Sequence, residues 1–190
     1  HPYGLEDRAC ADCLAGLAIS YQLQGDVTRA CSMIERLISQ IDMRSGWFYD
    51  VIAGSTKARV NCLQGNAEDA LQWARSFVPV KEPGMLFIWI EVPSLTWARV
   101  MIVHGSDEER HEAVKFLMEL RELVSAVHYT NQLVEIQVLL ALANYREGNV
   151  DKALEAVHQA LDVTGYRRWL RPFIEAGAQM REIIEQGMAL

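Results

Sequence analysis

A short phrase built around glycine and alanine occurs four times in this chain, and its spacing is the strongest constraint on the fold. The phrase reads LQGDVTRA at 23–30, LQGNAEDALQWA at 63–74, VHGSDEERHEA at 103–113 and REGNVDKALEA at 146–156. The glycines of the phrase are separated by 40, 40 and 43 residues and are Gly25, Gly65, Gly105 and Gly148. A period near 40 residues indicates one structural unit stacked several times along an array.

Each phrase predicts the corner between two antiparallel helices. Glycine has no Cβ and therefore suits the left-handed turn that ends the first helix. Asp26, Asn66 and Asn149 follow three of the glycines, and we expect their side chains to cap the next helix. A small residue that lets a neighbouring backbone come close stands seven places before each glycine, namely Ala18, Ala58, Ala98 and Ala141.

A single helix pair cannot bury its apolar face alone, so successive pairs are expected to stack. The sequence therefore predicts one all-α domain over 1–190, a right-handed superhelical solenoid with a concave groove. The predicted repeat units cover about 5–42, 47–77, 86–127 and 130–164, followed by a closing segment at 165–190 with one helix near 172–187. Pro93 falls inside the helix predicted at 86–104, where it should bend or restart that helix.

Composition excludes several classes of protein. The formal net charge of -7 argues against direct nucleic-acid binding, which needs clustered Lys and Arg. The longest apolar run, MLFIWI at 85–90, is much shorter than the roughly 20 residues of a membrane span. The four cysteines lie among apolar helical residues, which favours a reducing cytoplasm. The first residues lack an initiator Met and a signal-peptide pattern, so we expect a fragment of a larger protein.

Three segments carry a family resemblance: ARVNCLQGNAEDALQWA at 58–74, ARVMIVHG at 98–105 and GYRRWLRPFIEAG at 165–177. The glycine and alanine spacing resembles tetratricopeptide repeats stretched beyond their usual 34 residues. Together the segments resemble the helical-repeat sensor region of MalT-like large ATP-binding LuxR-family regulators, which are bacterial. This resemblance implies an ATPase before the repeats, a superhelix that senses signals and supports oligomerisation, and a DNA-binding domain after it. The chain itself contains no GxxxxGK[ST] phosphate loop.

The candidate ligand site follows from placing the repeats on tetratricopeptide geometry. The groove positions are Ser55, Arg59, Cys62, Leu95, Arg99, Ile102, Glu135 and Leu142. Arg59 and Arg99 occupy equivalent positions in adjacent repeats, and their guanidinium groups could anchor a carboxylate or phosphate. The alternative is structural, with these arginines paired to Glu91 or Glu135.

No arrangement of residues predicts catalysis, a cofactor or a metal. Cys10 and Cys13 form CADC, but a second pair of ligands is missing from the sequence. Two functions therefore stay open. The chain is either a sensor that binds a small organic effector and signals to other domains of a regulator, or a scaffold that binds protein segments. In the second case, the chain ends could also stack on further repeats or on a second copy.

Overall fold

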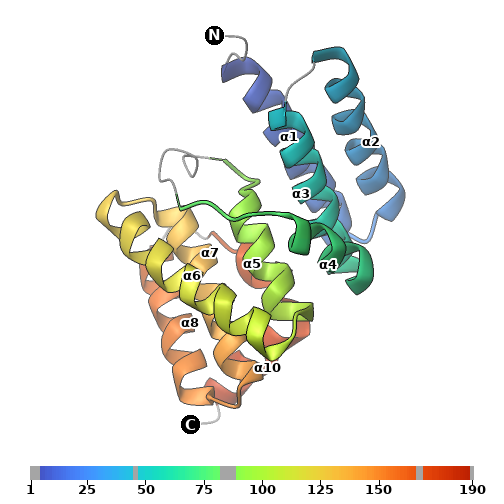
Figure 1. The fold of residues 1–190 in the computed structure, drawn as a ribbon. Coiled ribbons are helices and arrows are strands. Elements are labelled where there is room, and N and C mark those ends of the chain that lie inside the picture. Colours follow the sequence, from blue (N-terminus) through green and yellow to red (C-terminus); the bar gives the residue numbers. More distant parts are fainter. Residues whose placement is uncertain (1–4, 45–46, 82–88, 166–168, 189–190) are drawn as a thin grey trace. The chain divides into compact units, whose positions relative to one another are not determined.

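The computed structural model of the chain describes residues 5–44, 47–81, 89–165 and 169–188, and the regular elements in these ranges are helices (Figure 1). The predicted all-α class is therefore confirmed. The helices are α1 (Leu5–Leu23), α2 (Val27–Arg44), α3 (Trp47–Gln64), α4 (Ala67–Ser76), α5 (Pro93–His104), α6 (Asp107–Ala126), α7 (Thr130–Arg146), α8 (Val150–Thr164), α9 (Arg171–Glu175) and α10 (Gly177–Met188). None of those helices, over the ranges just given, combines the length and apolar character of a membrane span.

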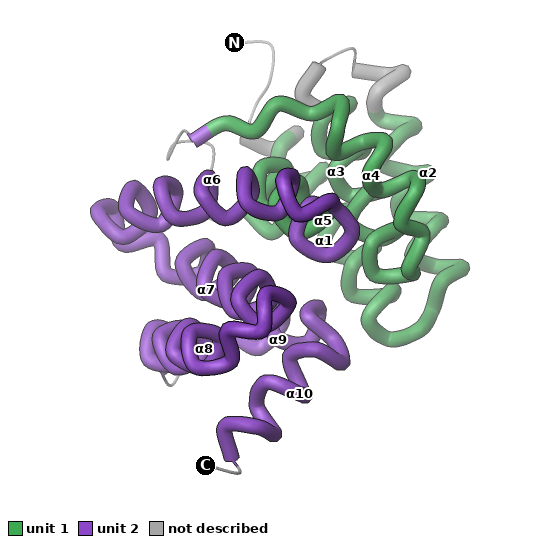
Figure 2. The backbone as a smooth tube through the Cα atoms, turned by 60° about the horizontal axis from the view of Figure 1, so that its bottom comes forward, with its two compact units in different colours: residues 1–80, 89–100 green, residues 81–88, 101–190 purple. Residues whose placement is uncertain are grey.

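The chain divides into two compact units, coloured separately in Figure 2. Unit 1 comprises residues 1–80 and 89–100, and unit 2 comprises residues 81–88 and 101–190. The division falls inside α5, after Val100.

Unit 1 is built around α1 and α3. Helix α1 packs against α2 and α3, and α3 packs against α4. Small residues at helical spacing on α1 let the neighbouring backbones approach closely, because alanine adds little volume at the contact. Two clusters of buried side chains fill the unit: Ala11, Leu14, Leu37, Tyr49, Ile52 and Ala53 form one, and Ala18, Ile34 and Val60 form the other.

Unit 2 is built around α7. This helix packs against α6, α8, α9 and α10, and each residue from Val134 to Ala143 is buried. A helix that is largely apolar around its whole circumference requires cover on every side. The polar exceptions in this buried stretch, Glu135 and Gln137, therefore need hydrogen-bonding partners inside the protein.

Three of the four corners have the left-handed turn predicted from their glycines. Gly25, Gly65 and Gly148 have φ angles of 80, 79 and 78°. At the second corner Asn66 N donates to Asn61 O over 2.9 Å, a closure typical of the Schellman motif. The first and last of these corners close in the same way.

The corner at Gly105 is different, and the prediction of a left-handed turn is wrong there. Gly105 is not among the glycines with positive φ. A Cβ at this position would lie 2.5 Å from Met101 O, much closer than real Cβ atoms approach a carbonyl. Crowding against the backbone, and not the sign of φ, therefore explains this glycine.

The predicted caps are correct at one of three positions. Asp26 Oδ1 accepts a hydrogen bond from the N–H of Arg29 over 3.0 Å. Asn66 and Asn149 precede α4 and α8 but make no side-chain cap; their amide nitrogens donate to side chains two residues earlier. Ser106, in contrast, forms a full capping box at the start of α6.

Helix α5 begins at Pro93, so the prediction of one helix over 86–104 is wrong at its start. Residues 89–92 are not helical, and residues 82–88 lie outside the described part of the chain. Proline fits the first helical position because its missing N–H would have no intrahelical partner there.

The closing segment contains two helices, α9 and α10, and not the single predicted helix. Helix α9 ends at Glu175, Ala176 is a turn residue, and Gly177, the first residue of α10, has a φ angle of 62°. This left-handed residue turns the chain between α9 and α10 and gives the two helices different directions.

Candidate functional site

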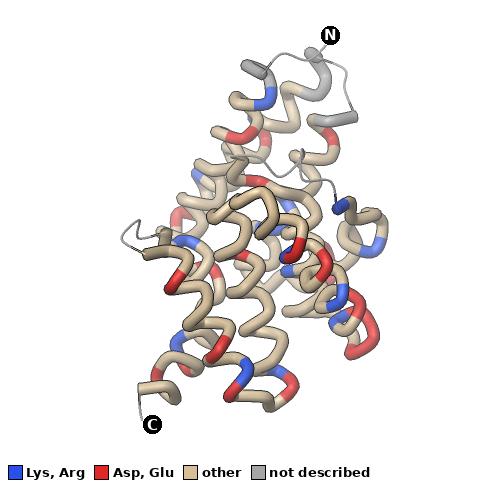
Figure 3. The backbone as a smooth tube through the Cα atoms, turned by 90° about the vertical axis from the view of Figure 1, so that its left-hand side faces the viewer, with Lys and Arg blue, Asp and Glu red and all other residues tan. Residues whose placement is uncertain are grey.

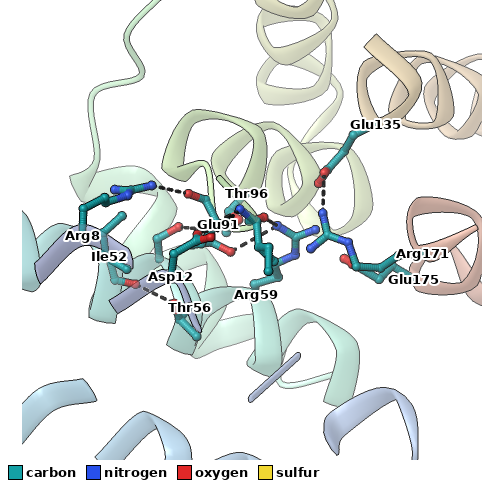
Figure 4. A network of polar contacts seen from close by, with 12 residues as sticks. Arg8, Asp12, Ile52, Thr56, Arg59, Glu91, Thr96, Glu135, Arg171 and Glu175 are labelled. Atoms are coloured by element: carbon teal, nitrogen blue, oxygen red, sulfur yellow. Dashed lines mark hydrogen bonds and ion pairs between the residues drawn. The ribbon is translucent and has the colours of Figure 1, made fainter. Parts of the chain in front are cut away.

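A buried carboxylate lies at the centre of the polar side chains of unit 1. Glu91, in the segment just before α5, has a relative exposure of 0%. Arg59 Nη1 lies 3.1 Å from Glu91 Oε2, and the Thr96 hydroxyl donates to Oε1 over 2.6 Å (Figure 4). The Ser55 hydroxyl also donates to Oε1. Three side-chain donors thus surround one carboxylate.

The main chain of residues 90 and 91, like the Glu91 side chain, is held by hydrogen bonds to charged side chains. The Asp12 carboxylate accepts hydrogen bonds from the N–H groups of Ile90 and Glu91, each over 2.9 Å. Arg8 Nη2 donates to the Glu91 carbonyl over 2.8 Å, and its guanidinium lies 4.7 Å from the Trp89 ring centre. Burial lowers the pKa of Arg8, while the carboxylates of Asp12 and Glu91 act in the opposite direction.

Helical spacing brings these donors and acceptors together. Arg8 and Asp12 are four residues apart on α1, and Ser55 and Arg59 are four residues apart on α3. Residues at this spacing share a helix face, so each helix presents two polar groups to the same neighbour. Helix α1 therefore holds the main chain of residues 90–91, and α3 holds the Glu91 side chain.

The arrangement has a structural role, because its hydrogen bonds hold residues 89–92 in place within unit 1. Taking a carboxylate and a guanidinium out of water is costly, and the cost is recovered only when hydrogen bonds satisfy both groups. Here Glu91 has donors on both carboxylate oxygens. The cluster therefore fixes where α5 begins relative to α1 and α3 within unit 1.

The eight residues predicted to bind a ligand fall into both units. Ser55, Arg59, Cys62, Leu95 and Arg99 belong to unit 1, and Ile102, Glu135 and Leu142 belong to unit 2. Cys62 is partly exposed, whereas the other seven are buried. Ligand binding by these residues stays a prediction from the sequence.

The alternative prediction of a structural ion pair is confirmed for Arg59, because it pairs with Glu91. Three other members of the cluster, Arg8, Asp12 and Thr96, were not among the predicted site residues. The signal that could have found two of them is the pair of opposite charges at i and i+4 on the largely apolar helix α1.

A second buried cluster lies in unit 2. Arg171 Nη2 lies 3.2 Å from Glu135 Oε2, and Arg171 Nε lies 3.5 Å from Glu175 Oε1 (Figure 4). The guanidinium also lies 5.2 Å from the ring centre of Trp169. Glu135, predicted as a groove residue, thus connects α7 to the closing segment through α9.

Neither cluster has the arrangement of a catalytic site. The carboxylates accept from arginine, hydroxyl and main-chain N–H groups, and neither cluster as described contains a histidine that could act as a base. Groups of three or more His, Cys, Asp or Glu suited to a metal ion are likewise missing from the described residues. Acidic and basic residues are interspersed along the helices, with uncharged residues between many of them (Figure 3).

Comparison with known protein families gives one match for this chain. A family described as the MalT-like TPR region matches residues 3–189, which is almost the whole sequence. Searches among curated proteins and among solved structures gave no significant match.

Proposed function

The chain belongs to the MalT-like TPR family, and from this we propose that it is the helical-repeat sensor domain of a MalT-like transcription regulator. In this role it binds a small organic effector and passes the change to ATPase and DNA-binding domains of the same regulator. The family match over residues 3–189 carries the proposal. The proposed role is non-catalytic, because the domain acts by changing conformation. The proposed location is cytoplasmic, because the regulator acts on DNA.

The effector is proposed to act at the unit 1 part of the predicted site. Arg59 and Arg99 hold equivalent positions in adjacent repeats, and Leu95 and Cys62 add apolar surface near them in the sequence pattern. Arg59 is fully buried and already neutralised by Glu91. A carboxylate or phosphate on the effector therefore reaches Arg59 by taking the place of the Glu91 carboxylate.

Displacing Glu91 supplies a way to signal. The hydrogen bonds from Ser55 and Thr96 to the carboxylate would be lost together with the Arg59 pair. Residues 89–92 would then lose the side-chain hydrogen bonds to the Glu91 carboxylate while keeping the main-chain bonds to Asp12 and Arg8, and the start of α5 could shift. An effector that binds the form with the displaced Glu91 better than the form with the Arg59–Glu91 pair moves the equilibrium towards the displaced form.

A thermal-shift screen of the chain against carboxylate- and phosphate-bearing metabolites tests the proposal. A ligand that binds the folded state raises Tm in proportion to its affinity and concentration. For a hit, calorimetry should show that Arg99→Met weakens binding by about 1.5–3 kcal/mol, the range for a charge-assisted contact. Arg36→Met, at an exposed position on α2, is the control and should leave affinity unchanged.

The proposed site would be wrong if a confirmed ligand bound folded Arg59→Met and Arg99→Met as tightly as the original chain. The wider proposal of an effector would be wrong if no metabolite in the screen shifted Tm. These two results are distinguishable, because the first still leaves a ligand to be placed.

A protein-interaction scaffold without a small ligand is the second candidate function. The observation that favours it is the set of exposed apolar side chains on α9 and α10, which include Ile174 and Met188. A stoichiometric complex with a defined protein partner, formed without any metabolite, would support this function over the sensor.

A further inference from the structure

A pocket of about 340 Å³ in unit 2 is lined by side chains of α6, α7 and α8, the three helices at the left of Figure 2. We call it the α6–α8 pocket and define it by Met118, Arg121, Gln137, Leu140, Glu155 and Gln159. The eight groove residues predicted from the sequence are not among those that line it. Its volume lies in the range of pockets that take small molecules.

Gln137, on α7, brings a buried acceptor to this pocket. Its side chain is 5% exposed, and its Nε2 donates to Gln159 Oε1 over 2.9 Å. Gln159 Nε2 in turn donates to Glu155 Oε1 over 3.2 Å. An ionised carboxylate accepts and does not donate, so this chain of bonds fixes which atom of each amide is the oxygen. Gln137 Oε1 is thus an acceptor, and it receives no hydrogen bond from another residue in the described ranges.

A buried acceptor without a donor raises the free energy of the folded chain. The amide geometry turns Gln137 Oε1 away from Gln159, because Nε2 points towards it. The wall of the pocket opposite α8 is α6, which contributes Met118 and Arg121. A ligand that donates an N–H from this side would satisfy the oxygen.

Arg121, on α6, supplies a cation near Gln137. Both residues lie within about two turns of the corner that joins α6 to α7, and these two helices pack against each other. The Arg121 guanidinium bonds to the adjacent Glu122 through Nε and Nη2, and the Glu122 side chain is 74% exposed. An exposed pair of this kind is weak, so an anionic group in the pocket can compete for Arg121.

Apolar side chains lie next to this polar end. Leu140 follows Gln137 by one turn on α7, and Met118 precedes Arg121 by one turn on α6. Because the two helices are antiparallel, these steps run in the same direction along the pocket. Met118 is 49% exposed and flexible, and its rotation gives a ligand access to Gln137 Oε1, which has less than 1 Å² exposed.

We propose that the α6–α8 pocket binds a free α-amino acid with an apolar side chain. The ammonium donates to Gln137 Oε1, the carboxylate pairs with Arg121, and the side chain lies on Met118 and Leu140. An α-amino acid carries its two charges on neighbouring atoms beside an apolar group, which is the order of groups along the pocket. Glu155, bonded to Gln137 through Gln159, adds negative charge on the side of the ammonium. The site shares no residue with the effector site proposed in unit 1, so either proposal can fail alone.

A nuclear magnetic resonance titration of the isotope-labelled chain with L-leucine tests the proposal. Leucine should shift the side-chain amide signals of Gln137 and Gln159, with a Kd of about 1 mM for a small ligand in an open pocket. Two analogues test the two charges: 4-methylpentanoate lacks the ammonium, and leucinamide lacks the carboxylate. Each should bind at least about tenfold more weakly than leucine, because each loses one charge-assisted contact.

Two variants test the protein side of the same contacts. Gln137→Leu removes the buried acceptor, so it should stay folded and bind leucine at least about tenfold more weakly. Arg121→Met should bind leucine and leucinamide equally, because the cation that distinguishes them is gone. Arg181→Met, at an exposed position on α10 of the same unit, is the control and should bind leucine as the original chain does. Circular dichroism checks that each variant is folded.

Three results would overturn the proposal. The first is that leucine at about 10 mM, ten times the expected Kd, shifts no signal. The second is that either analogue binds the original chain as tightly as leucine, or that folded Gln137→Leu and Arg121→Met bind leucine unchanged. The third is tighter binding of the tripeptide glycyl-leucyl-glycine than of leucine, which would make the pocket a peptide groove.

Discussion

The Arg59 and Glu91 side chains form an ion pair with no exposure to solvent. Such a pair contributes little by being charged, but it becomes costly when one partner is removed. Arg59→Met keeps most of the volume and leaves Glu91 with only its hydroxyl donors. We expect this variant to lower the free energy of unfolding by about 3 kcal/mol, measured by urea denaturation at neutral pH and followed by circular dichroism.

The double variant Arg59→Met with Glu91→Gln distinguishes the energetic contribution of the ion pair from that of side-chain packing. Glutamine retains an oxygen that can accept from Ser55 and Thr96, and no unpaired charge is left in the cluster. We expect the double variant to be more stable than Arg59→Met alone, with a coupling of at least about 1 kcal/mol between the two sites. Strictly additive losses would mean that the ion pair has no energetic role.

At the scale of elements, the corners depend on backbone conformation. Gly65 has a φ of 79°, and no atom lies within 4 Å of the position that a Cβ would take. A side chain there therefore meets no neighbour, and only the left-handed backbone opposes it. We expect Gly65→Val to lower the free energy of unfolding by more than about 1 kcal/mol, since a β-branched residue is strained at positive φ. Thermal unfolding measures the change, and an unaltered Tm would refute the corner as described.

His128, between α6 and α7, provides the reverse control, because its replacement by glycine removes a Cβ at positive φ whereas Gly65→Val adds one. It has a φ of 58° and is the residue other than glycine with positive φ in the described ranges. His128→Gly removes the strain of a Cβ in this conformation and gives the unfolded chain more freedom. The two effects oppose each other, so we expect no loss, and a gain of at most about 1 kcal/mol. A clear loss would show that the imidazole contributes contacts of its own.

At the scale of the whole molecule, the sequence predicted the positions of the helices better than it predicted contacts between distant residues. The repeat of glycine near 40 residues located three of the four helix pairs, at 5–42, 47–77 and 130–164, to within about two residues at their outer ends. The exception is α5, where the helical pattern of 86–104 continued through Pro93 although the chain itself does not. Periodicity reports which residues share a face, but it cannot report which side chain meets a given buried charge.

The two buried clusters illustrate this difference. Glu91 and Glu135 were the two carboxylates considered as structural partners of Arg59 and Arg99, and Arg59 pairs with Glu91. The partner of Glu135 is Arg171, which lies 36 residues later in the closing segment and outside the repeat pattern. No register relates the two positions, so only the folded structure reveals this pair.

The charge of the molecule leads to a prediction about DNA. The chain has 18 Lys and Arg against 25 Asp and Glu, a formal net charge of -7, and acidic residues accompany the basic ones along the helices (Figure 3). Binding to duplex DNA requires several cations that neutralise phosphates and release counterions, which makes such binding strongest at low salt. We therefore expect fluorescence anisotropy with a labelled promoter fragment to show no specific binding by this chain, even at low ionic strength. Binding that is sequence-selective and weakens with added salt would contradict the prediction, and would mean that a local cluster of Lys and Arg outweighs the negative charge of the whole.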